Sequence, residues 1–549
     1  MCLDGGISAR ARHLLLATLL PALALLAAPG GASAARGFQY GVAAGDVDTD
    51  SAILWARANR PGPVLIQIDT DRRLGSCGAD GPFVFARGAN NNTVQTRISG
   101  LRPGTRYFYR FCRRGNAFSD TGSFETAPRP NQARTIRFAL SGDQDALPRP
   151  GQSRPFWNNF QVWNLIRKER NHFNVLLGDT IYSDTEVPGY GLSNVATTVP
   201  KKWAKYRINL RLDPWARARG AASYYAHWDD HEFINDFSPF ENQFPLGVGD
   251  VNINGRVLYR RGVKAFRDYN PITYSARNGI YRSFRWGKNL DVFFLDERSF
   301  RSPSADYQGT CDNPPGSGDP DLAPTAPQST RNVFSIIAPQ LANPVPPACT
   351  QRIKDPDRTL LGSRQLARFK RDIARSTATF KVIFSEVPIQ QYYALPYDRW
   401  EGYEAERLAL INFLRRRVES VVFLTTDVHA NLVNDVRLQT LESGGPVDSG
   451  ITELTTGPIA TATYSQEISD AVDNASAGPL VQSAFLKPQP PNGVGMRCAA
   501  TDQFSYAQVT VSKRLLTVQL KDIRGARVKD TGDRDQPAPP CGPYVFPAQ

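Results

Sequence analysis

The chain has 549 residues, of which 41% are hydrophobic, and it carries a formal net charge of +13 at pH 7. This length excludes a single ordinary domain, and the apolar content is that of a globular protein with a sizeable core. The basic balance favours anionic partners such as phosphate esters or acidic polymers. An arginine-rich surface without a specific role is an equal alternative, because no long Lys/Arg run occurs.

The N-terminus has the pattern of a secretory signal. Arg10, Arg12 and His13 precede the apolar run LLLATLLPALALLAA, which leads into the small-residue motif ASA. The run is short for a membrane span, and Pro21 interrupts it. We expect residues 1–34 to be cleaved, the protein to be secreted, periplasmic or attached to the cell envelope, and the mature chain to lack a transmembrane segment. An uncleaved anchor is the alternative.

Six cysteines remain after the signal. An even number in an exported chain indicates three disulfides, although spacing alone does not fix their connectivity. We expect nearest neighbours to pair: Cys77 with Cys112, Cys311 with Cys349, and Cys498 with Cys541.

Residues 36–128 predict an all-β domain. Short alternating segments such as SAILWARA, PVLIQID and TRYFYRFC are separated by Gly/Pro turns, as in a β-sandwich. The stretch GLRPGTRYFYRF is similar to the late strands of fibronectin type III modules, which implies an Ig-like domain here.

Residues 134–549 predict an α/β domain. Buried-type strands such as FNVLLGD and VVFLTTD alternate with amphipathic segments such as SRQLARFKRDIAR. Residues 302–358 are Pro-rich, contain two cysteines and show no periodicity, so we expect a long stapled surface loop.

Acidic and histidine side chains follow at least four of these strands. Ligands of α/β folds bind at the carboxyl ends of strands, so distant segments are expected to meet there. The residues are Asp143 with Asp145, Asp179, Asp229 with Asp230 and His231, and Asp427 with His429.

Carboxylates that converge in a partly dry site repel one another. At ~4 Å and an effective dielectric of ~20, each like-charged pair costs about 4 kcal/mol. Protonation or bound cations relieve this repulsion, and the mixture of Asp, His and Tyr favours cations. Two-metal sites of this kind serve phosphoester hydrolysis.

The order GDQD, GDTIY, WDDHE, LDER, TTDVH resembles the PhoD-like alkaline phosphatases and phosphodiesterases, within the calcineurin-like metallophosphoesterases. The resemblance covers nearly the whole mature chain. It implies a sandwich of sheets flanked by helices, and a monomeric, secreted enzyme that hydrolyses phosphate esters through a metal-activated hydroxide. The substrate would be a small molecule or an anionic polymer, without specific nucleic-acid recognition.

The resemblance also implies roles for individual residues. Asp179 would bridge two metals, Tyr182 would bind the redox-capable one, and His231 would contact the phosphate and assist the leaving group. The further metal-ligand candidates are Asp143, Asp229, Asp230, Asn235, Asp427 and His429. Ca²⁺ and Fe³⁺ are expected, with Mn²⁺, Mg²⁺ or Zn²⁺ as alternatives.

Three positions depart from the family pattern. Gly142 and Asp143 stand where relatives often carry Cys, and Thr426 stands where they often carry Gly. Arg-Ala-Arg replaces the twin arginine of many export signals. The metals and the export route therefore stay open.

Several alternatives remain. Arg298 and Arg301 could hold the phosphate or form structural ion pairs, although we favour Arg298 as a member of the catalytic machinery. Asp145 could be a ligand or a helix N-cap, and His227 is expected in the core or behind the ligands. The alternative function is a non-catalytic cell-surface protein that binds a polymer and has a degenerate metal site.

Overall fold

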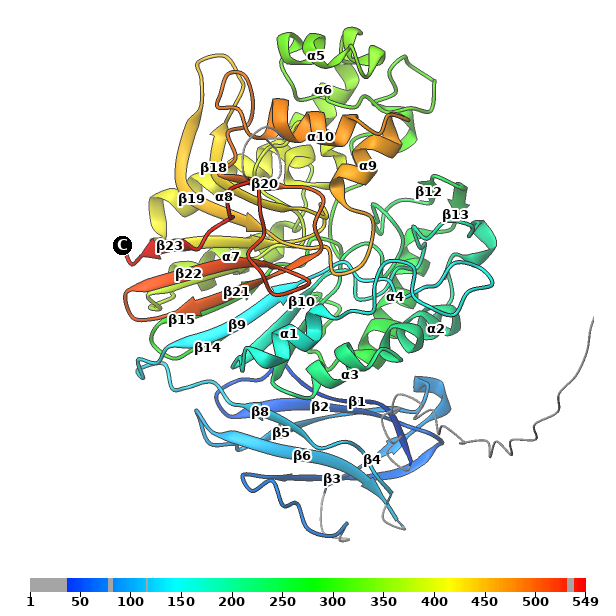
Figure 1. Cartoon of the computed structure of the whole chain (residues 1–549), viewed down its shortest axis with the longest axis vertical. Coiled ribbons are helices and arrows are strands. Elements are labelled where there is room, and N and C mark those ends of the chain that lie inside the picture. The colour runs from blue at the N-terminus through cyan, green and yellow to red at the C-terminus, as the bar shows by residue number, and fades with distance from the viewer. Residues whose placement is uncertain (1–36, 78–81, 115–116, 531–537) are drawn as a thin grey trace, which may run out of the picture. The chain divides into compact units, whose positions relative to one another are not determined.

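The computed structural model describes residues 37–77, 82–114, 117–530 and 538–549, and the expected signal at 1–34 lies outside them. Figure 1 shows the chain. No helix of the described residues is long and apolar enough to cross a membrane.

Two large sheets form the core, and in each of them three neighbouring strands of a longer parallel row lead to the predicted site. In the first sheet these are β9 (Ile136–Ser141), β10 (Phe173–Leu177) and β11 (Ser223–His227). In the second they are β15 (Leu290–Phe294), β16 (Phe380–Phe384) and β17 (Val421–Thr425). These six strands are the ones that carry the predicted site residues or their neighbours at their carboxyl ends.

The remaining strands extend both sheets. The first sheet has the order β23-β22-β21-β9-β10-β11-β1-β2-β5, and the second has the order β14-β15-β16-β17-β19-β18-β20. The added strands are β21 (Ser505–Val511), β22 (Leu515–Asp522) and β23 (Tyr544–Pro547) in the first sheet, and β14 (Arg282–Trp286), β18 (Asn431–Gln439), β19 (Val447–Thr455) and β20 (Cys498–Ala500) in the second.

Every second side chain along these strands points into the space between the two sheets, which explains why the sheets pack face to face. Phe138 and Val175 of the first sheet share one buried apolar cluster with Val292, Val382 and Leu424 of the second. The residues between them point outwards and are apolar as well, because helices cover both outer faces. Strands buried on both faces therefore read as continuous apolar runs in the sequence.

Helices complete the layers. The first sheet packs on α1 (Val162–Lys168), α2 (Val199–Leu210), α3 (Asp213–Arg219) and α4 (Gly255–Tyr269). The second packs on α7 (Ser363–Ala374) and α8 (Glu404–Arg417). The predicted α/β sandwich flanked by helices agrees with this arrangement.

The described part of residues 37–128 is built from strands, with no α-helix. β1 (Phe38–Gly45), β2 (Ser51–Ala58) and β5 (Thr93–Ser99) face a second sheet across one apolar cluster. That second sheet contains β3 (Gly62–Asp69), β4 (Phe83–Ala86), β6 (Arg106–Arg113), β7 (Ala117–Phe118) and β8 (Gly122–Glu125). β1 also pairs in parallel with β11, so its sheet continues into the nine-stranded sheet, a long-range pairing that the sequence did not predict.

The three disulfides join the predicted pairs. Residues 302–358 are more ordered than the expected loop, since they contain α5 (Gln328–Phe334) and α6 (Pro347–Lys354). Both helices are short and have proline at or next to their first residue, and Arg331 of α5 is held by an ion pair with Asp321. Tertiary contacts of this kind leave no periodic signal in the sequence.

The last elements lie near the site described below. They are the hairpin of β12 (Gln243–Leu246) and β13 (Gly249–Asn252), and the helices α9 (Tyr464–Ala471) and α10 (Ala477–Val481).

Candidate metal centre

The predicted ligands stand on tight turns directly after their strands. Asp143, Asp179, Asp427 and His429 have positive φ values of 62°, 47°, 68° and 51°. Asp and His adopt this left-handed conformation more readily than most residues, though it still strains the backbone. The strain is placed where the chain must leave the sheet and turn a side chain towards the neighbouring strands.

Side-chain ligand atoms converge in three overlapping groups, and the atoms of each group lie within 4.8 Å of one another. Asp179 belongs to two of the groups, and Asp230 also belongs to two. The groups are Asp143–Asp179–His429, Asp179–Asp230–His231 and Asp229–Asp230–Asp427. Four strand ends from both sheets therefore build one continuous set of donors.

This donor set fits metal ions. Oδ2 of Asp143 and Oδ2 of Asp229 are buried without a hydrogen-bond partner, which is costly for a carboxylate unless a cation compensates it. Burial raises the pKa of Asp143 to about 7, helped by nearby Asp229. Burial and neighbouring carboxylates also raise the pKa of Asp179 and of Asp427 well above the usual value. Cations bound among these oxygens would remove that penalty.

His429 is oriented by a residue that the sequence did not single out. Its Nδ1 makes a short hydrogen bond with Glu467 of α9, which leaves Nε2 on the side of Tyr182, 2.9 Å from the phenol oxygen. A carboxylate behind a ligating imidazole fixes the ring and its tautomer. Glu467 lies on a helix far along the chain, so no local motif marks it.

His231 has a similar partner in Asp184. Its Nδ1 lies 2.7 Å from Oδ1 of Asp184, and its ring stacks on Tyr182 with centroids 4.0 Å apart. Burial disfavours the charged ring, but Asp184, Asp230 and Asp179 outweigh it and raise the pKa of His231 well above its usual value. Asp184 directly follows GDTIYS in the sequence, so its place next to this motif could have identified it as a residue of the site.

An open cavity of about 400 Å³ is lined by His231 and Asn235. Its walls come from residues 184–191 and from the β12–β13 hairpin, and they include Asp184 and Glu186 but neither Lys nor Arg. The backbone amide of Asn235 donates to Oδ2 of Asp184. Asn235 is thus beside the site, and its amide proton helps to position the partner of His231.

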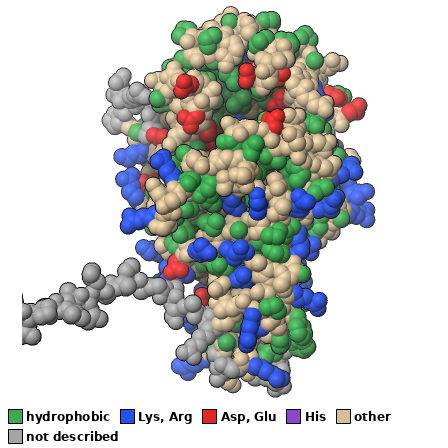
Figure 2. All heavy atoms as spheres, turned by 90° about the vertical axis from the view of Figure 1, so that its right-hand side faces the viewer, with side chains coloured by type: hydrophobic (Ala, Val, Ile, Leu, Met, Phe, Trp, Pro, Cys, Tyr) green, Lys and Arg blue, Asp and Glu red, His purple; other side chains and the backbone are tan. Residues whose placement is uncertain are grey.

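The molecule's basic residues are not concentrated in this cavity. On the face drawn in Figure 2, Asp and Glu side chains gather in the upper part, whereas Lys and Arg side chains spread over the lower part.

The contacts of Arg298 correct the role that we predicted for it. The side chain is fully buried, and its terminal nitrogens bind both oxygens of Asp398 at 2.6 and 2.7 Å while Nε binds Asp229. Arg301 also binds Asp398, at 2.6 Å. Although burial opposes it, these two guanidinium groups hold the pKa of Asp398 well below its usual range. The geometry is therefore that of a structural ion-pair network behind Asp229.

Two further expectations are settled by contacts. Asp145 accepts from the backbone amide of Leu147 at 2.9 Å and from the hydroxyl of Thr185, so it caps a turn; the first α-helix begins later, at Val162. His227 is buried in the core, with Nδ1 2.8 Å from the carbonyl of Trp228, and burial lowers its pKa to about 4.

The two departures from the family motifs fit each other. The hydroxyl of Thr426 donates to the carbonyl of Leu177 at 2.7 Å and so ties the end of β17 to the end of β10. A Cβ on residue 142 would lie 2.5 Å from that carbonyl and 3.0 Å from Cγ2 of Thr426. Gly142 therefore makes room for Thr426, and the ligands on either side keep their places.

Comparison with known proteins gives a consistent result. Residues 151–520 match the family model described as PhoD-like phosphatase, and residues 25–128 match its N-terminal domain. The chain is 25% identical over 440 residues to alkaline phosphatase D of Bacillus subtilis (strain 168), a match that covers 73% of this chain and 66%, just under two thirds, of that relative.

Solved structures agree on the fold. A structure of PhoD superposes with a TM-score of 0.66 at 19% identity, covering 94% of this chain and 92% of the other. A purple acid phosphatase from yellow lupin (Lupinus luteus) seeds superposes with a TM-score of 0.52 at 12% identity, covering 90% and 74%. Because the family model covers more than half of the chain and the N-terminal model matches the residues before it, the chain belongs to the PhoD-like phosphatase family.

Proposed function

We propose that this protein is a metal-dependent phosphoesterase that hydrolyses phosphate mono- or diesters. The observation that carries the proposal is the position of Asp179. Its carboxylate lies within 4.8 Å of ligand atoms of Asp143 and His429 in one group, and of Asp230 and His231 in another. A carboxylate placed in this way suits a bridge between two cations, and His231 next to it opens onto a cavity.

The roles of the residues follow from their contacts. Asp143, Asp179, Tyr182 and His429 would hold one cation, and Asp179, Asp229, Asp230 and Asp427 would hold the second. Bound cations would neutralise the phosphoryl oxygens and lower the pKa of the attacking water. His231, kept protonated by Asp184, would give the proton on its Nε2 to the leaving oxygen. Arg298 would act by positioning Asp229, which differs from the direct role that the sequence favoured.

The donors favour hard cations. The second group offers only carboxylate oxygens, which suits Ca²⁺, whereas the first adds an imidazole and a phenol, which also suit Fe³⁺, Mn²⁺ or Zn²⁺. Asp143 in place of a thiolate makes the first group harder still. We propose Ca²⁺ in the second group and Fe³⁺ in the first, with Mn²⁺, Mg²⁺ and Zn²⁺ as the alternatives to test.

The cavity beside His231 suggests which leaving groups are accepted. The protonated His231 balances Asp184 in its walls, but Glu186 has no Lys or Arg beside it in the lining, so a second phosphate on the leaving alcohol would be disfavoured. We propose that small neutral or cationic alcohols leave more readily than anionic polymers.

The remaining expectations stand as proposals of the same kind. The mature protein would begin after Ala34, act outside the cytoplasm as a monomer, and carry a fibronectin-like β-domain at 36–128 in front of the catalytic domain at 134–549. Intact-mass measurement of the exported protein and light scattering in solution test the cleavage and the oligomeric state.

The function is tested on purified protein stripped with a chelator. Ca²⁺, Fe³⁺, Mn²⁺, Mg²⁺ and Zn²⁺ are returned singly and in pairs, and hydrolysis of p-nitrophenyl phosphate and bis(p-nitrophenyl) phosphate is followed. Turnover that depends on the added metal supports the proposal. Absence of turnover with every combination would favour the alternative of a polymer-binding protein with a degenerate site.

A further inference from the structure

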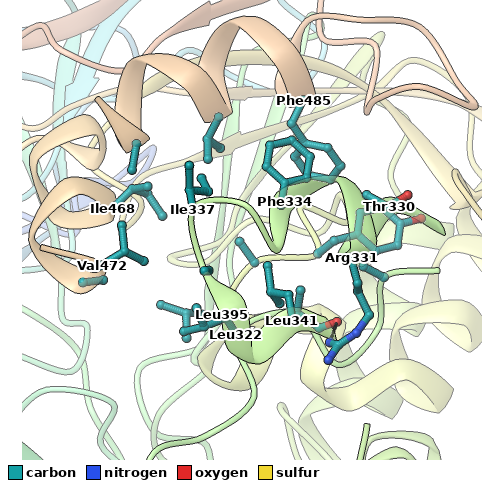
Figure 3. Close-up of a pocket in the computed structure, with 18 residues that line it drawn as sticks. Leu322, Thr330, Arg331, Phe334, Ile337, Leu341, Leu395, Ile468, Val472 and Phe485 are labelled. Carbon is teal, nitrogen blue, oxygen red and sulfur yellow. Dashed lines mark hydrogen bonds between the residues drawn. The ribbon is translucent and has the colours of Figure 1, made fainter. Parts of the chain in front are cut away.

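A second, narrow cavity of about 90 Å³ lies between the Pro-rich segment and the helices that follow β19. One wall comes from α5 and the 3₁₀ turn Pro339–Ala342, and the other from α9, α10 and the π-turn Gln482–Leu486. Figure 3 shows side chains of both walls turned towards a common space, among them Ile337, Phe334, Ile468 and Phe485.

The lining of this cavity is almost entirely hydrocarbon. Arg331 is its one charged member, and the guanidinium is neutralised by Asp321, whose oxygens lie 2.5 and 2.8 Å away. Figure 3 shows this guanidinium turned away from Ile468 and Val472. A ligand that fills the cavity must therefore be uncharged over the part that it buries, since nothing in the walls would balance a charge.

Exposed apolar side chains continue from the lining to the surface. Val333 is 64% and Ile336 87% exposed, next in sequence to the lining residues Phe334 and Ile337. Leu480 of α10 is 39% exposed. Each of the three exposed side chains is next in sequence to a residue that lines the cavity, so apolar surface occurs on the same elements as the lining.

One helix separates this cavity from the metal centre. On α9, Glu467 bonds His429, while Ile468 and Ala471 line the cavity. A molecule that occupies the cavity therefore lies against the helix that orients a candidate metal ligand.

We propose that this cavity binds a single hydrocarbon chain of an amphiphilic molecule, with the polar head left outside the apolar walls. A hydrocarbon chain fits better than a polar ring because its buried part needs no hydrogen bond and no counter-charge. The chain could belong to a phosphate-ester substrate or to a separate amphiphile, and the experiment has one arm for each source.

The first arm is calorimetric titration of the full mature protein with octyl, decyl and dodecyl maltoside below their micelle concentrations. It requires neither metal nor turnover, so its result is independent of the proposed phosphoesterase activity. We expect one molecule bound per chain, with affinity that rises about fourfold per methylene until the cavity is full. Absence of saturable binding, or affinity independent of chain length, would overturn the proposal.

Two variants and one control test whether the maltosides bind in this cavity. Ala471→Trp fills the mouth from an exposed position that lines the cavity, and Ala475→Trp makes the same change at an exposed position outside the lining. Leu395→Asp places a carboxylate in the wall at a residue whose φ is 43°, a conformation that Asp tolerates better than Leu. Ala471→Trp and Leu395→Asp should each weaken dodecyl maltoside binding at least tenfold, whereas Ala475→Trp should not. Equal binding by all three variants would contradict the assignment.

The second arm measures hydrolysis of butyl, octyl and dodecyl phosphate. If the chain belongs to the substrate, KM falls with chain length in the unmodified protein and loses that dependence in Leu395→Asp. If KM is independent of chain length while maltoside binding persists, the chain belongs to a separate amphiphile. A chain-length dependence that survives unchanged in Leu395→Asp would place substrate-chain recognition elsewhere and overturn the substrate source.

Discussion

Nδ1 of His231 lies 2.7 Å from Oδ1 of Asp184, and both side chains are buried. The carboxylate favours the protonated imidazole, and it also fixes the ring so that only Nε2 remains for a substrate. Asp184→Asn removes the negative charge with little change of shape. The pKa of His231 should then fall, so the alkaline limb of the pH dependence of kcat should move to lower pH. The value of kcat should drop by about 10²-fold or more, because less of the ring can donate a proton.

The loss in Asp184→Asn should also depend on the leaving group. An alkyl phosphate has a poor leaving alcohol that needs the proton, whereas p-nitrophenol leaves with less assistance. Activity should therefore fall further on the alkyl ester. Asp120→Asn, at an exposed position in the N-terminal strands, serves as the control. Equal losses on both esters with an unshifted pH profile would show that Asp184 is only structural.

Asp179 should control metal content and activity together. Asp179→Asn weakens a donor that belongs to two ligand groups, one of which contains His429 and the other His231, so elemental analysis should find less than half of the bound metal and turnover should vanish. Asp319→Asn, an exposed acid outside the site, should retain both. Normal activity of Asp179→Asn would show that the metal centre has been placed wrongly.

Glu467 should set the affinity for the cation held by His429. Glu467→Gln keeps the shape but removes the negative charge behind Nδ1, and loss of such a partner weakens metal binding by about 10–100-fold. Competition with a chelator measures this directly, without reference to turnover. Asp470→Asn on the same helix is exposed and provides the matched control. An unchanged affinity in Glu467→Gln would separate His429 from the metal.

The fold and the convergence of the candidate ligands were predictable to the extent that they are local. Strands buried on both faces produce continuous apolar runs, and Asp or His directly after such a run can be read from the chain, which is how Asp143, Asp179 and His429 were found. The pairing of β1 with β11 depends on contacts 179 residues apart, between Gly45 and Tyr224, and no local pattern contains it.

The partners behind the ligands escaped prediction for the same reason. Glu467 lies on α9 and Asp398 on the 3₁₀ turn Pro396–Asp398, and tertiary packing alone brings them to His429 and Arg298. Without Asp398, the sequence left Arg298 free to be assigned to phosphate. Burial of its whole side chain among carboxylates favours the structural ion pairs.

Arg298 should therefore matter for stability. Arg298→Met preserves volume but leaves Asp229 without its guanidinium partner and Asp398 with Arg301 alone, and breaking a buried ion pair in this way costs about 3–5 kcal/mol. Urea unfolding should show this loss, while Arg371→Met at an exposed position of α7 should change little. If Arg298→Met unfolds like the unmodified protein and only loses activity, the direct role towards phosphate is restored.

Glu241 should lower stability at alkaline pH. Burial raises its pKa to about 7, from an ordinary value of 4.5, and nearby Asp306 and Asp398 add to the effect. The folded chain thus holds a proton that the unfolded chain releases between pH 4.5 and 7, so stability falls as pH rises through that window. The loss of stability above pH 7 is of order 1–3 kcal/mol.

The variant Glu241→Gln tests this. It keeps an acceptor for the backbone amide of Ser304, which bonds Oε1 of Glu241 at 2.6 Å, and it removes the titrating group. Urea unfolding should find the variant more stable than the unmodified protein at pH 8 and equal to it near pH 5. A difference that is the same at both pH values would contradict the assignment of a raised pKa to Glu241.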